Sequence, residues 1–280
     1  MSTETAAQPL VALVTGASSG IGEATARRLA HEPGARLVLV ARREERLRAL
    51  AESLPVPASH VAVDLTDDDA PERVLAHVQQ QERGRLTLLV NNAGSAWRAT
   101  FAEGGWANVQ RTMAVNFDAV LRLTEALLPL LRASAPSSIV NVASTAGRVT
   151  RGGSAAYSAS KFALAGWSDG LYIEERARGV HVGVVLPGFI ATEGFPQEEL
   201  QAKALTRRLV STPDRAAEAI IDAGLRGRAE RYVPRVYALA AVARVLAPGL
   251  VRRVLAGGSA AIMTTRTGAD TVEQEPEGRS

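Results

Sequence analysis

A tyrosine and a lysine stand four residues apart, at positions 157 and 161, in a segment with a helical pattern. This spacing places both side chains on one face of a helix, one turn apart. A phenol with a pKa near ~10 is too weak an acid for proton transfer at neutral pH, and lowering that pKa by about three units requires about 4 kcal/mol of phenolate stabilisation. An ammonium group nearby supplies much of it. The pair therefore indicates acid–base chemistry; the alternative is a surface Tyr and Lys on an amphipathic helix.

A second candidate site lies near the N-terminus, where an apolar run leads into the sequence TGASSGIG at residues 15–22 and then into a helical pattern. Glycines at 16, 20 and 22 allow positive φ angles and let backbone amides approach a pyrophosphate, to which the helix N-terminus adds its positive dipole end. The spacing departs from the common G-x-G-x-x-G pattern, so a tight turn without a ligand is the alternative.

The cofactor preference is predicted from the end of the second expected strand, about 20 residues past the glycines. An Asp or Glu there would bind the ribose 2′-hydroxyl of NAD, but the chain has Arg42 and Arg43. A guanidinium group can bind a phosphate with two parallel hydrogen bonds. The residues favour NADP(H) over NAD(H), unless both arginines are simply solvated at the start of a helix.

Composition excludes several classes of protein. The 280 residues are 46% hydrophobic and 22% charged, contain no cysteine and only four histidines, and carry a net charge of +3. Disulfides and Cys-ligated metals are excluded, and we expect no metal site. With 4% aromatic residues and charges of mixed sign, the chain does not resemble a nucleic-acid-binding protein. The first residues lack the basic stretch followed by an apolar run that is typical of a signal peptide. No apolar run reaches the ~18 residues of a membrane-spanning helix, so we expect a cytoplasmic protein.

Short apolar runs alternate with longer segments of helical period, which predicts an α/β fold with one doubly wound, Rossmann-type parallel sheet of about seven strands. We expect strands at residues 10–15, 36–41, 60–63, 86–91, 138–143, 180–186 and 231–233. We expect helices at residues 21–31, 44–53, 71–83, 106–133 and 156–178, with two more after Phe195.

No repeat, linker or break in composition divides the chain before about residue 257. We therefore expect a single domain over residues 1–256, in which residues 187–256 form a substrate lid and a basic helical segment. Residues 257–280 are mostly polar and acidic with little apolar periodicity, which predicts a disordered tail.

Taken together, the motifs resemble those of the short-chain dehydrogenase/reductase family. The matching features follow one another in the family's order, namely TGASSGIG at 15–22, Asp64, NNAG at 91–94, Asn116, Ser144, YSASK at 157–161 and PGFIAT at 187–192. Each alone has an ordinary structural explanation as a turn, cap or loop residue, but their joint order is specific to the family.

The resemblance implies a role for each of four catalytic residues. Tyr157 would be the general acid/base for a secondary alcohol or ketone, and Lys161 would lower its pKa and bind the nicotinamide ribose. Ser144 would hold the substrate oxygen, and Asn116 would place a water that links Lys161 to solvent. The family pattern also implies a cofactor site made of Gly16, Ser18, Ser19, Gly20, Ile21, Gly22, Arg42, Arg43, Asp64, Asn92, Gly94, Tyr157, Lys161, Pro187, Gly188 and Thr192.

The intact catalytic positions favour an enzyme over a dinucleotide-sensing or scaffold protein on the same fold, which is the alternative function. Apolar residues after Gly188, among them Phe189 and Ile190, with Phe195 and Leu200, favour an apolar or bulky carbonyl substrate, with Trp97 and residues 148–153 on the opposite wall. The family also implies a homodimer or homotetramer, built through the helices at 106–133 and 156–178.

The C-terminal part of the chain is unusually basic. Residues 206–256 hold ten arginines and four acidic residues, a surplus of six positive charges, and residues 232–256 are apolar apart from arginines. This segment could lie at the interface of an anionic membrane, as a peripheral lipid-processing reductase would require, or cover the active site, or contact a second subunit. Pro248 and Gly249 would break it into two short helices.

Overall fold

The computed structural model describes residues 9–192 and 210–263, with the backbone alone at 257–263. A seven-stranded sheet of order β3-β2-β1-β4-β5-β6-β9 forms the centre, and all its strand pairs are parallel. The strands are β1 (Val11–Thr15), β2 (Arg36–Ala41), β3 (Ala58–Ala62), β4 (Leu88–Asn91), β5 (Ser137–Val142), β6 (Val180–Pro187) and β9 (Glu230–Val233). The chain reverses its direction of winding between β1 and β4, where ligands bind in sheets of this kind.

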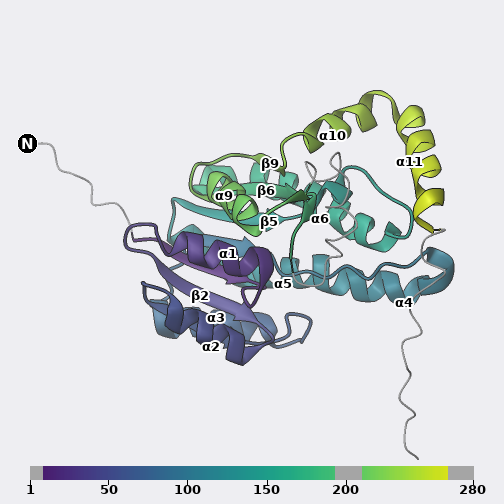
Figure 1. The fold of residues 1–280 in the computed structure, drawn as a ribbon. Coiled ribbons are helices and arrows are strands. Elements are labelled where there is room, and N and C mark those ends of the chain that lie inside the picture. The colour runs from purple at the N-terminus through teal and green to yellow at the C-terminus, as the bar shows by residue number, and fades with distance from the viewer. Residues whose placement is uncertain (1–8, 193–209, 264–280) are drawn as a thin grey trace, which may run out of the picture.

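Helices cover both faces of this sheet (Figure 1). On one face lie α1 (Gly20–Leu29), α2 (Glu44–Ser53) and α9 (Pro213–Gly224), and on the other lie α3 (Ala70–Glu82), α5 (Ala119–Ala133) and α6 (Ala155–Glu175). A strand buried on both faces points successive side chains to opposite helical layers. In β1, for example, Val14 joins the cluster under α1 and α9, whereas Leu13 joins the cluster under α3 and α5.

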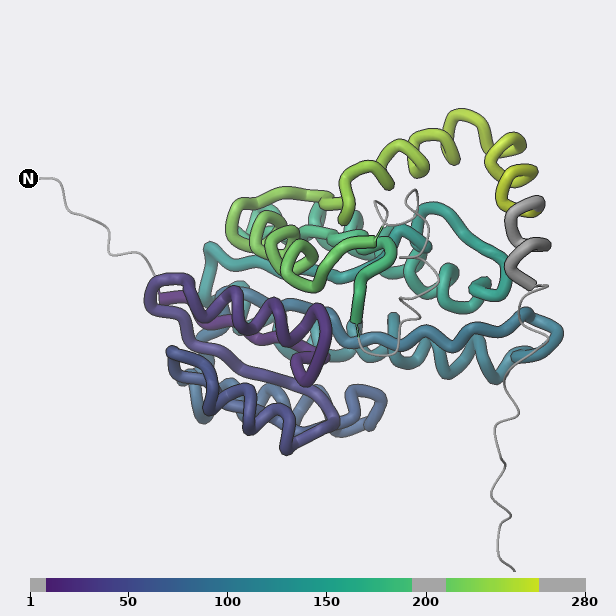
Figure 2. Tube along the Cα trace, in the orientation of Figure 1, coloured from purple at the N-terminus to yellow at the C-terminus, as the bar shows by residue number. Residues whose placement is uncertain are grey.

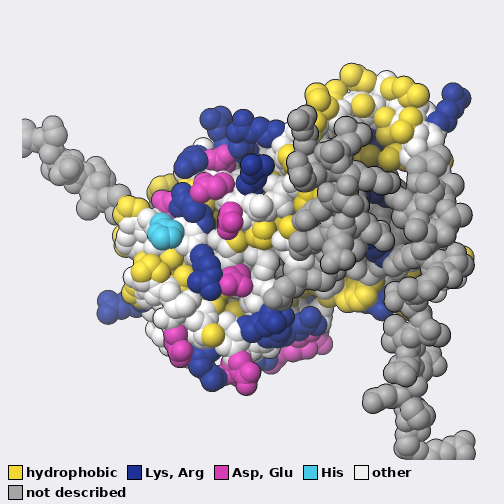
Figure 3. All heavy atoms as spheres, viewed as in Figure 1, with side chains coloured by type: hydrophobic (Ala, Val, Ile, Leu, Met, Phe, Trp, Pro, Cys, Tyr) yellow, Lys and Arg dark blue, Asp and Glu magenta, His cyan; other side chains and the backbone are white. Residues whose placement is uncertain are grey.

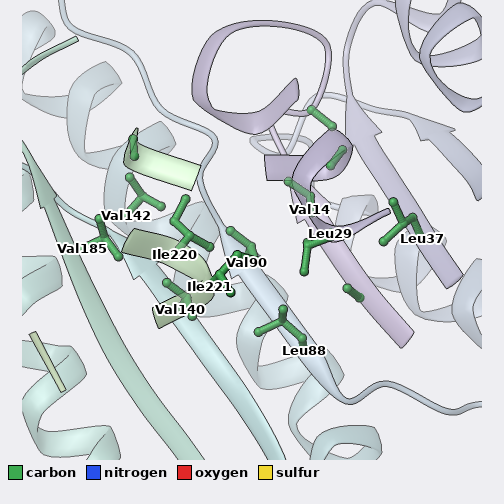
Figure 4. Close-up of a cluster of buried hydrophobic side chains, with 14 of the residues drawn as sticks. Val14, Leu29, Leu37, Leu88, Val90, Val140, Val142, Val185, Ile220 and Ile221 are labelled. Carbon is green, nitrogen blue, oxygen red and sulfur yellow. The ribbon is translucent and has the colours of Figure 1, made fainter. Parts of the chain in front are cut away.

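The first of these clusters shows how the core positions the site. Figure 4 shows Val14 and Val90 beside Leu29 of α1 and Ile220 of α9, directly behind the carboxyl ends of β1 and β4. Burying each such side chain contributes about 1.5–3 kcal/mol. The loops that follow these two strands therefore rest on a close-packed layer.

The predicted fold class is confirmed, and so is the existence of all seven strands, with ends displaced by at most two residues. The helix expected at residues 106–133 is different. It starts earlier, as α4 (Phe101–Met113), and a π-helical turn (Ala114–Asp118) separates it from α5. Within α4, Gly105 has a non-helical backbone with φ of 51° and bends the first turns.

The C-terminal region also departs from expectation. A short parallel pair, β7 (Phe189–Ile190) and β8 (Val210–Ser211), was not predicted, and it brings the two ends of residues 191–209 together. The helices α10 (Tyr237–Leu246) and α11 (Pro248–Met263) meet at Ala247, as the expected break at Pro248 requires. Because α11 reaches Met263, residues 257–263 of the predicted tail are helical. Residues 264–280 lie outside the described residues, as do Phe195 and Leu200.

Candidate active site

The glycine loop, the turn after β4 and the segment after β6 are packed together at the carboxyl edge of the sheet. Gly16 and Gly20 have φ angles of 65° and 58°. A Cβ on Gly16 would lie 2.9 Å from Nδ2 of Asn92, and a Cβ on Gly20 would lie 3.1 Å from Cγ2 of Thr192. Three motifs that are far apart in the sequence therefore touch here, and the glycines are required by both conformation and space.

Asn92 ties this turn to the end of β1. Its side-chain amide donates to the carbonyl oxygen of Thr15 at 2.9 Å, and its backbone amide donates to Oγ1 of Thr15, also at 2.9 Å. A Cβ on Gly22 would overlap the carbonyl oxygen of Gly16, so α1 can begin close to β1 only with glycine at 22. The amides of the first helical turn, which have no intrahelical acceptors, are held at this edge.

Arg43 lies across the glycine loop. Its Nη2 donates to Oγ of Ser18 at 3.0 Å and to Oγ of Ser19 at 2.7 Å. Ser19 is the N-cap residue of α1, yet its hydroxyl accepts from Arg43 and caps no backbone amide. The structure thus places an exposed guanidinium group beside the start of α1, where an anion is stabilised by the helix dipole.

Arg42 and Asp64 form an exposed ion pair on the neighbouring strand ends, with Nη1 3.5 Å from Oδ2. Burial alone would raise the pKa of Asp64, but hydrogen bonds from the backbone and hydroxyl of Thr66 and the charge of Arg42 together lower it. Asp64 is therefore ionised at neutral pH. It also fixes the turn after β3 through Thr66, so its ordinary structural role as a turn residue is present.

Tyr157 and Lys161 lie in the first turns of α6, next to the end of β5. The Tyr157 hydroxyl hydrogen-bonds to Ser144, and burial raises the pKa of the phenol more than Ser144 and the positive charge of Arg98 lower it. Nζ of Lys161 donates to the carbonyl oxygen of Val142 at 2.9 Å, and burial lowers the pKa of this ammonium to about 8. Lys161 is not among the groups that shift the pKa of Tyr157 here, and its ammonium group is directed at the backbone of β5; its expected effect on Tyr157 stays a prediction.

Ser144 joins the ends of two strands. Its hydroxyl donates to the carbonyl oxygen of Pro187 at 3.2 Å and accepts from the amide of Ala146 at 3.1 Å. It thereby caps a 3₁₀ turn (Thr145–Gly147), and its hydroxyl also faces Tyr157. The cap that was the structural explanation of Ser144 is therefore present, and its catalytic role stays a prediction.

Asn116 is fully buried in the π-helical turn and connects three segments. Its Nδ2 donates to the carbonyl oxygen of Ser95 at 2.9 Å and to Oγ of Ser160 at 3.1 Å, and its Oδ1 accepts from the amide of Ser95 at 2.8 Å. A Cβ on Gly94 would lie 2.9 Å from this Oδ1 and 3.5 Å from Nζ of Lys161. Gly94, Asn116 and Lys161 thus meet at one point.

Sequence reasoning missed polar groups near Tyr157 and near the segment that follows β6. The charge of Arg98 acts on Tyr157, and the guanidinium group of Arg151 lies 4.2 Å above the ring of Phe189. Arg151 also hydrogen-bonds to Tyr237, whose ring packs against Gly188. The contact between Arg151 and Phe189 supports the prediction that residues 148–153 lie opposite Phe189 in the substrate pocket. The sequence around Arg98 and Arg151 has no pattern from which the contacts of these two arginines could be predicted.

A buried amide network behind the site was also missed. Nδ2 of Asn91 donates to Oγ1 of Thr124 and to Oδ1 of Asn141, and Nδ2 of Asn141 donates to Oγ of Ser168, all at 2.8–3.0 Å. Two asparagines inside apolar strands were the signal that could have found it, because buried amides need partners.

Over residues 9–192 and 210–263, no group of three His, Cys, Asp or Glu side chains could hold a metal ion. Among the same residues, no helix is both long and apolar enough to cross a bilayer.

Comparison with known proteins agrees with this geometry. A family model described as short chain dehydrogenase matches residues 10–203. Ketoacyl reductase HetN of Nostoc sp. is 33% identical over 213 residues, which are 75% of this chain and 74% of the relative. The 3-oxoacyl-(acyl-carrier-protein) reductase FabG of Escherichia coli is 34% identical over 186 residues (65% and 74%), and sulfoacetaldehyde reductase 2 of Chromohalobacter salexigens is 38% identical over 187 residues (65% and 73%). The chain belongs to the short-chain dehydrogenase/reductase family, and its class of chemistry is oxidoreduction of CH–OH and C=O groups.

Proposed function

We propose that the protein is an NADP(H)-dependent oxidoreductase that interconverts a secondary alcohol and a ketone, with Tyr157 as the general acid/base. The observation that carries this proposal is the hydrogen bond between Tyr157 and Ser144, one helical turn from the buried ammonium of Lys161. A sensor or scaffold protein would have no use for a phenol, a hydroxyl and an ammonium group gathered at one strand end.

In the reducing direction, the Ser144 hydroxyl would turn from the carbonyl oxygen of Pro187 and donate a hydrogen bond to the carbonyl oxygen of the substrate, while Tyr157 donates its proton to the same oxygen. In the oxidising direction, Tyr157 removes the proton of the alcohol. With a pKa of about 8, Lys161 is mostly charged at neutral pH, and its ammonium group would have to turn from the carbonyl oxygen of Val142 to stabilise the phenolate that forms. We assign to Asn116 the placement of a water between Lys161 and solvent.

The cofactor site fits a dinucleotide, because the glycine loop leaves no room for side chains at 16, 20 and 22 and holds the first turn of α1 open at the sheet edge. When bound, the nicotinamide cofactor supplies or accepts the hydride. Its pyrophosphate would be held by the loop residues from Gly16 to Gly22. The adenosine part would be held by Asp64, Asn92 and Gly94, and the nicotinamide part by Tyr157, Lys161, Pro187, Gly188 and Thr192.

The preference for NADP(H) rests on Arg43. Its guanidinium group already bridges Ser18 and Ser19 next to a helix N-terminus, which suits a 2′-phosphate. Arg42 contributes less, because Asp64 partly neutralises it.

For the substrate, we propose an apolar or bulky carbonyl compound, supported by the half-buried ring of Phe189, which follows Gly188 and is covered by the guanidinium group of Arg151. The relatives are named for substrates as different as ketoacyl compounds and sulfoacetaldehyde, so family membership alone does not select one.

We propose a homodimer or homotetramer formed through α4, α5 and α6, on which Trp106, Phe162 and Ile173 are exposed. The cytoplasmic location stays a prediction.

The direct test is consumption of NADPH over a graded panel of ketones and aldehydes, from small and polar to steroid-sized and long-chain, with Tyr157→Phe as the blank. Turnover that depends on Tyr157 is the expected result, and the accepted compounds define the substrate class. If the wild type binds NADPH but turns over no compound on the panel, the dinucleotide-sensing alternative gains weight. If Tyr157→Phe is as active as the wild type, the proposed mechanism is wrong.

A further inference from the structure

The helices α10 and α11 carry an apolar surface that faces away from the protein. Leu239, Val242 and Leu246 follow the i, i+3, i+7 spacing of one helical face, and their exposed fractions are 70%, 54% and 79%. No residue of α10 is buried. In an ordinary surface helix such a face would pack on the core; here it forms the exposed hydrophobic surface over α10 and α11 in Figure 3.

The two helices project from the rest of the fold. Figure 2 shows α10 leaving the end of β9 in a direction away from the central sheet, after which the chain turns once into α11. In α11 the apolar strip continues with Leu250 and Val254, one turn apart and 62% and 65% exposed, next to the exposed Arg252 and Arg253. We refer to these seven residues, from Leu239 to Val254, as the C-terminal strip.

The charged residues of the segment that carries the strip have one sign. From residue 231 to residue 269 the sequence contains six arginines and no aspartate, glutamate or lysine. Exposed apolar side chains combined with arginines alone are typical of helices that lie in the headgroup region of anionic membranes.

We propose that the C-terminal strip docks on an anionic membrane surface, with Leu239, Val242 and Leu246 in the headgroup–acyl boundary and Arg252 and Arg253 at lipid phosphates. Docking on a second copy through the same strip would bring like charges together, because a two-fold contact pairs a surface with itself. The strip begins at the active site, since Tyr237, the first residue of α10, packs on Gly188 and hydrogen-bonds to Arg151. The proposal goes beyond the oxidoreductase function and does not depend on it.

The test measures binding of the full chain to sedimented vesicles of phosphatidylcholine with and without phosphatidylserine. We expect binding to the anionic vesicles at low ionic strength, much weaker binding to neutral ones, and a loss of binding in about 0.5 M salt. Arg252→Glu with Arg253→Glu should weaken binding to anionic vesicles by at least about thirtyfold, from about 1 kcal/mol for each cation lost. The matched control, Arg83→Glu with Arg176→Glu, makes the same change in charge on exposed arginines elsewhere and should bind almost as the wild type.

A second variant tests the apolar part. Leu239→Ser with Leu246→Ser changes only exposed side chains, so it should keep the wild-type unfolding temperature and lose at least tenfold in vesicle binding. The proposal is overturned if the wild type does not bind anionic vesicles at low salt, or if the charge-reversal variant and its control bind equally. It is also overturned if the serine variant lowers the mass of the assembly in sedimentation while vesicle binding is unchanged. No step of this test uses enzyme activity, so its failure is separate from failure of the proposed function.

Discussion

The cofactor end and the chemical end of the site are built in different ways. At the proposed cofactor end, the groups available for recognition are backbone amides and exposed side chains such as Arg43 and Arg42, the latter 73% exposed. At the chemical end, Asn116 and Lys161 are 0% and 4% exposed and are bonded to the backbone or to other buried groups.

The difference has an energetic consequence. A buried polar group that loses its partner costs about 1–3 kcal/mol, whereas an exposed group is resolvated by water. Cofactor preference in this chain can therefore change with little effect on stability, while a change at the chemical end alters stability and chemistry together.

The largest effect is expected for Tyr157→Phe. Removing the hydroxyl should lower kcat/KM by about a thousandfold, within the range of general acid–base catalysis, and leave NADPH affinity within about threefold. The measurement combines turnover on a substrate found with the carbonyl panel and fluorescence titration of NADPH. Tyr172→Phe makes the same chemical change elsewhere on α6 and should remain active; equal loss in both variants would contradict the role of Tyr157.

Lys161→Met should change how stability depends on pH. Burial lowers the pKa of Lys161 from 10.5 to about 8, so between these values the unfolded chain binds more protons than the folded chain. The free energy of unfolding of the wild type should therefore rise with pH across this window, by up to about 3 kcal/mol, as the buried charge is lost. Urea unfolding at pH 8 and pH 10 measures this. If the free energy of unfolding changes equally with pH in Lys161→Met and in the wild type, the buried charge of Lys161 is not the cause and the prediction is wrong.

Asn116→Ala should destabilise the fold by about 2–3 kcal/mol, because it removes three hydrogen bonds and leaves the amide of Ser95 without its acceptor. Asn108→Ala on the neighbouring helix is the control, since Asn108 makes a weaker set of contacts, at 3.5 Å to Trp97 and 3.0 Å to Arg111. Urea unfolding should show a larger loss in the free energy of unfolding for Asn116→Ala than for Asn108→Ala. A larger loss for Asn108→Ala would contradict the proposed link between burial and stability at the chemical end.

Arg43→Gln should raise the KM for NADPH by about tenfold to a hundredfold, the value of one charge-assisted contact, and leave the KM for NADH and the melting temperature unchanged. Arg48→Gln is the control, because Arg48 lies on α2, the helix that Arg43 precedes as N-cap residue, and is paired only with Glu44 among the contacts described. If Arg43→Gln lowers the melting temperature, the contacts of Arg43 at the cofactor end stabilise the fold, and the proposed difference between the two ends is wrong.

The smallest effect is expected for Arg42→Gln. An exposed ion pair such as Arg42–Asp64 contributes less than about 1 kcal/mol, so NADPH affinity should fall by no more than about fivefold. Isothermal titration with NADPH measures the affinity. If Arg42→Gln loses as much NADPH affinity as Arg43→Gln, the proposal that Arg43 contributes more than Arg42 is wrong.

Much of the fold was predictable because its signals are local. The apolar runs of β1 to β6 and the helical periods between them identify a parallel sheet, and the order of the motifs then brings Gly16, Asn92 and Thr192 to one edge. Other features depend on contacts between loops. The pairing of Phe189 with Val210, the approach of Arg151 to Phe189 and the position of Arg98 near Tyr157 are set by tertiary packing and leave no periodic pattern.

The direction of the Tyr157 pKa could not be predicted for a similar reason. The four-residue spacing places Lys161 on the correct face, but the ammonium is directed by the carbonyl group of Val142, a residue of another element. Helical spacing determines which residues are neighbours on a helix. It does not determine the position of the charged group at the end of a long, flexible side chain.

The π-helical turn at Ala114–Asp118 acts as an insertion of one residue between two helices. A π-helical turn is wider than an α-helical one and takes up this extra residue, so α5 keeps the orientation of an uninterrupted helix. Deleting a single residue within the turn should therefore leave Leu123, Leu127 and Leu131 of α5 on the sheet, but it should displace Asn116 from Ser95 and Ser160. The extra residue is thus needed to place one buried amide and not to pack α5.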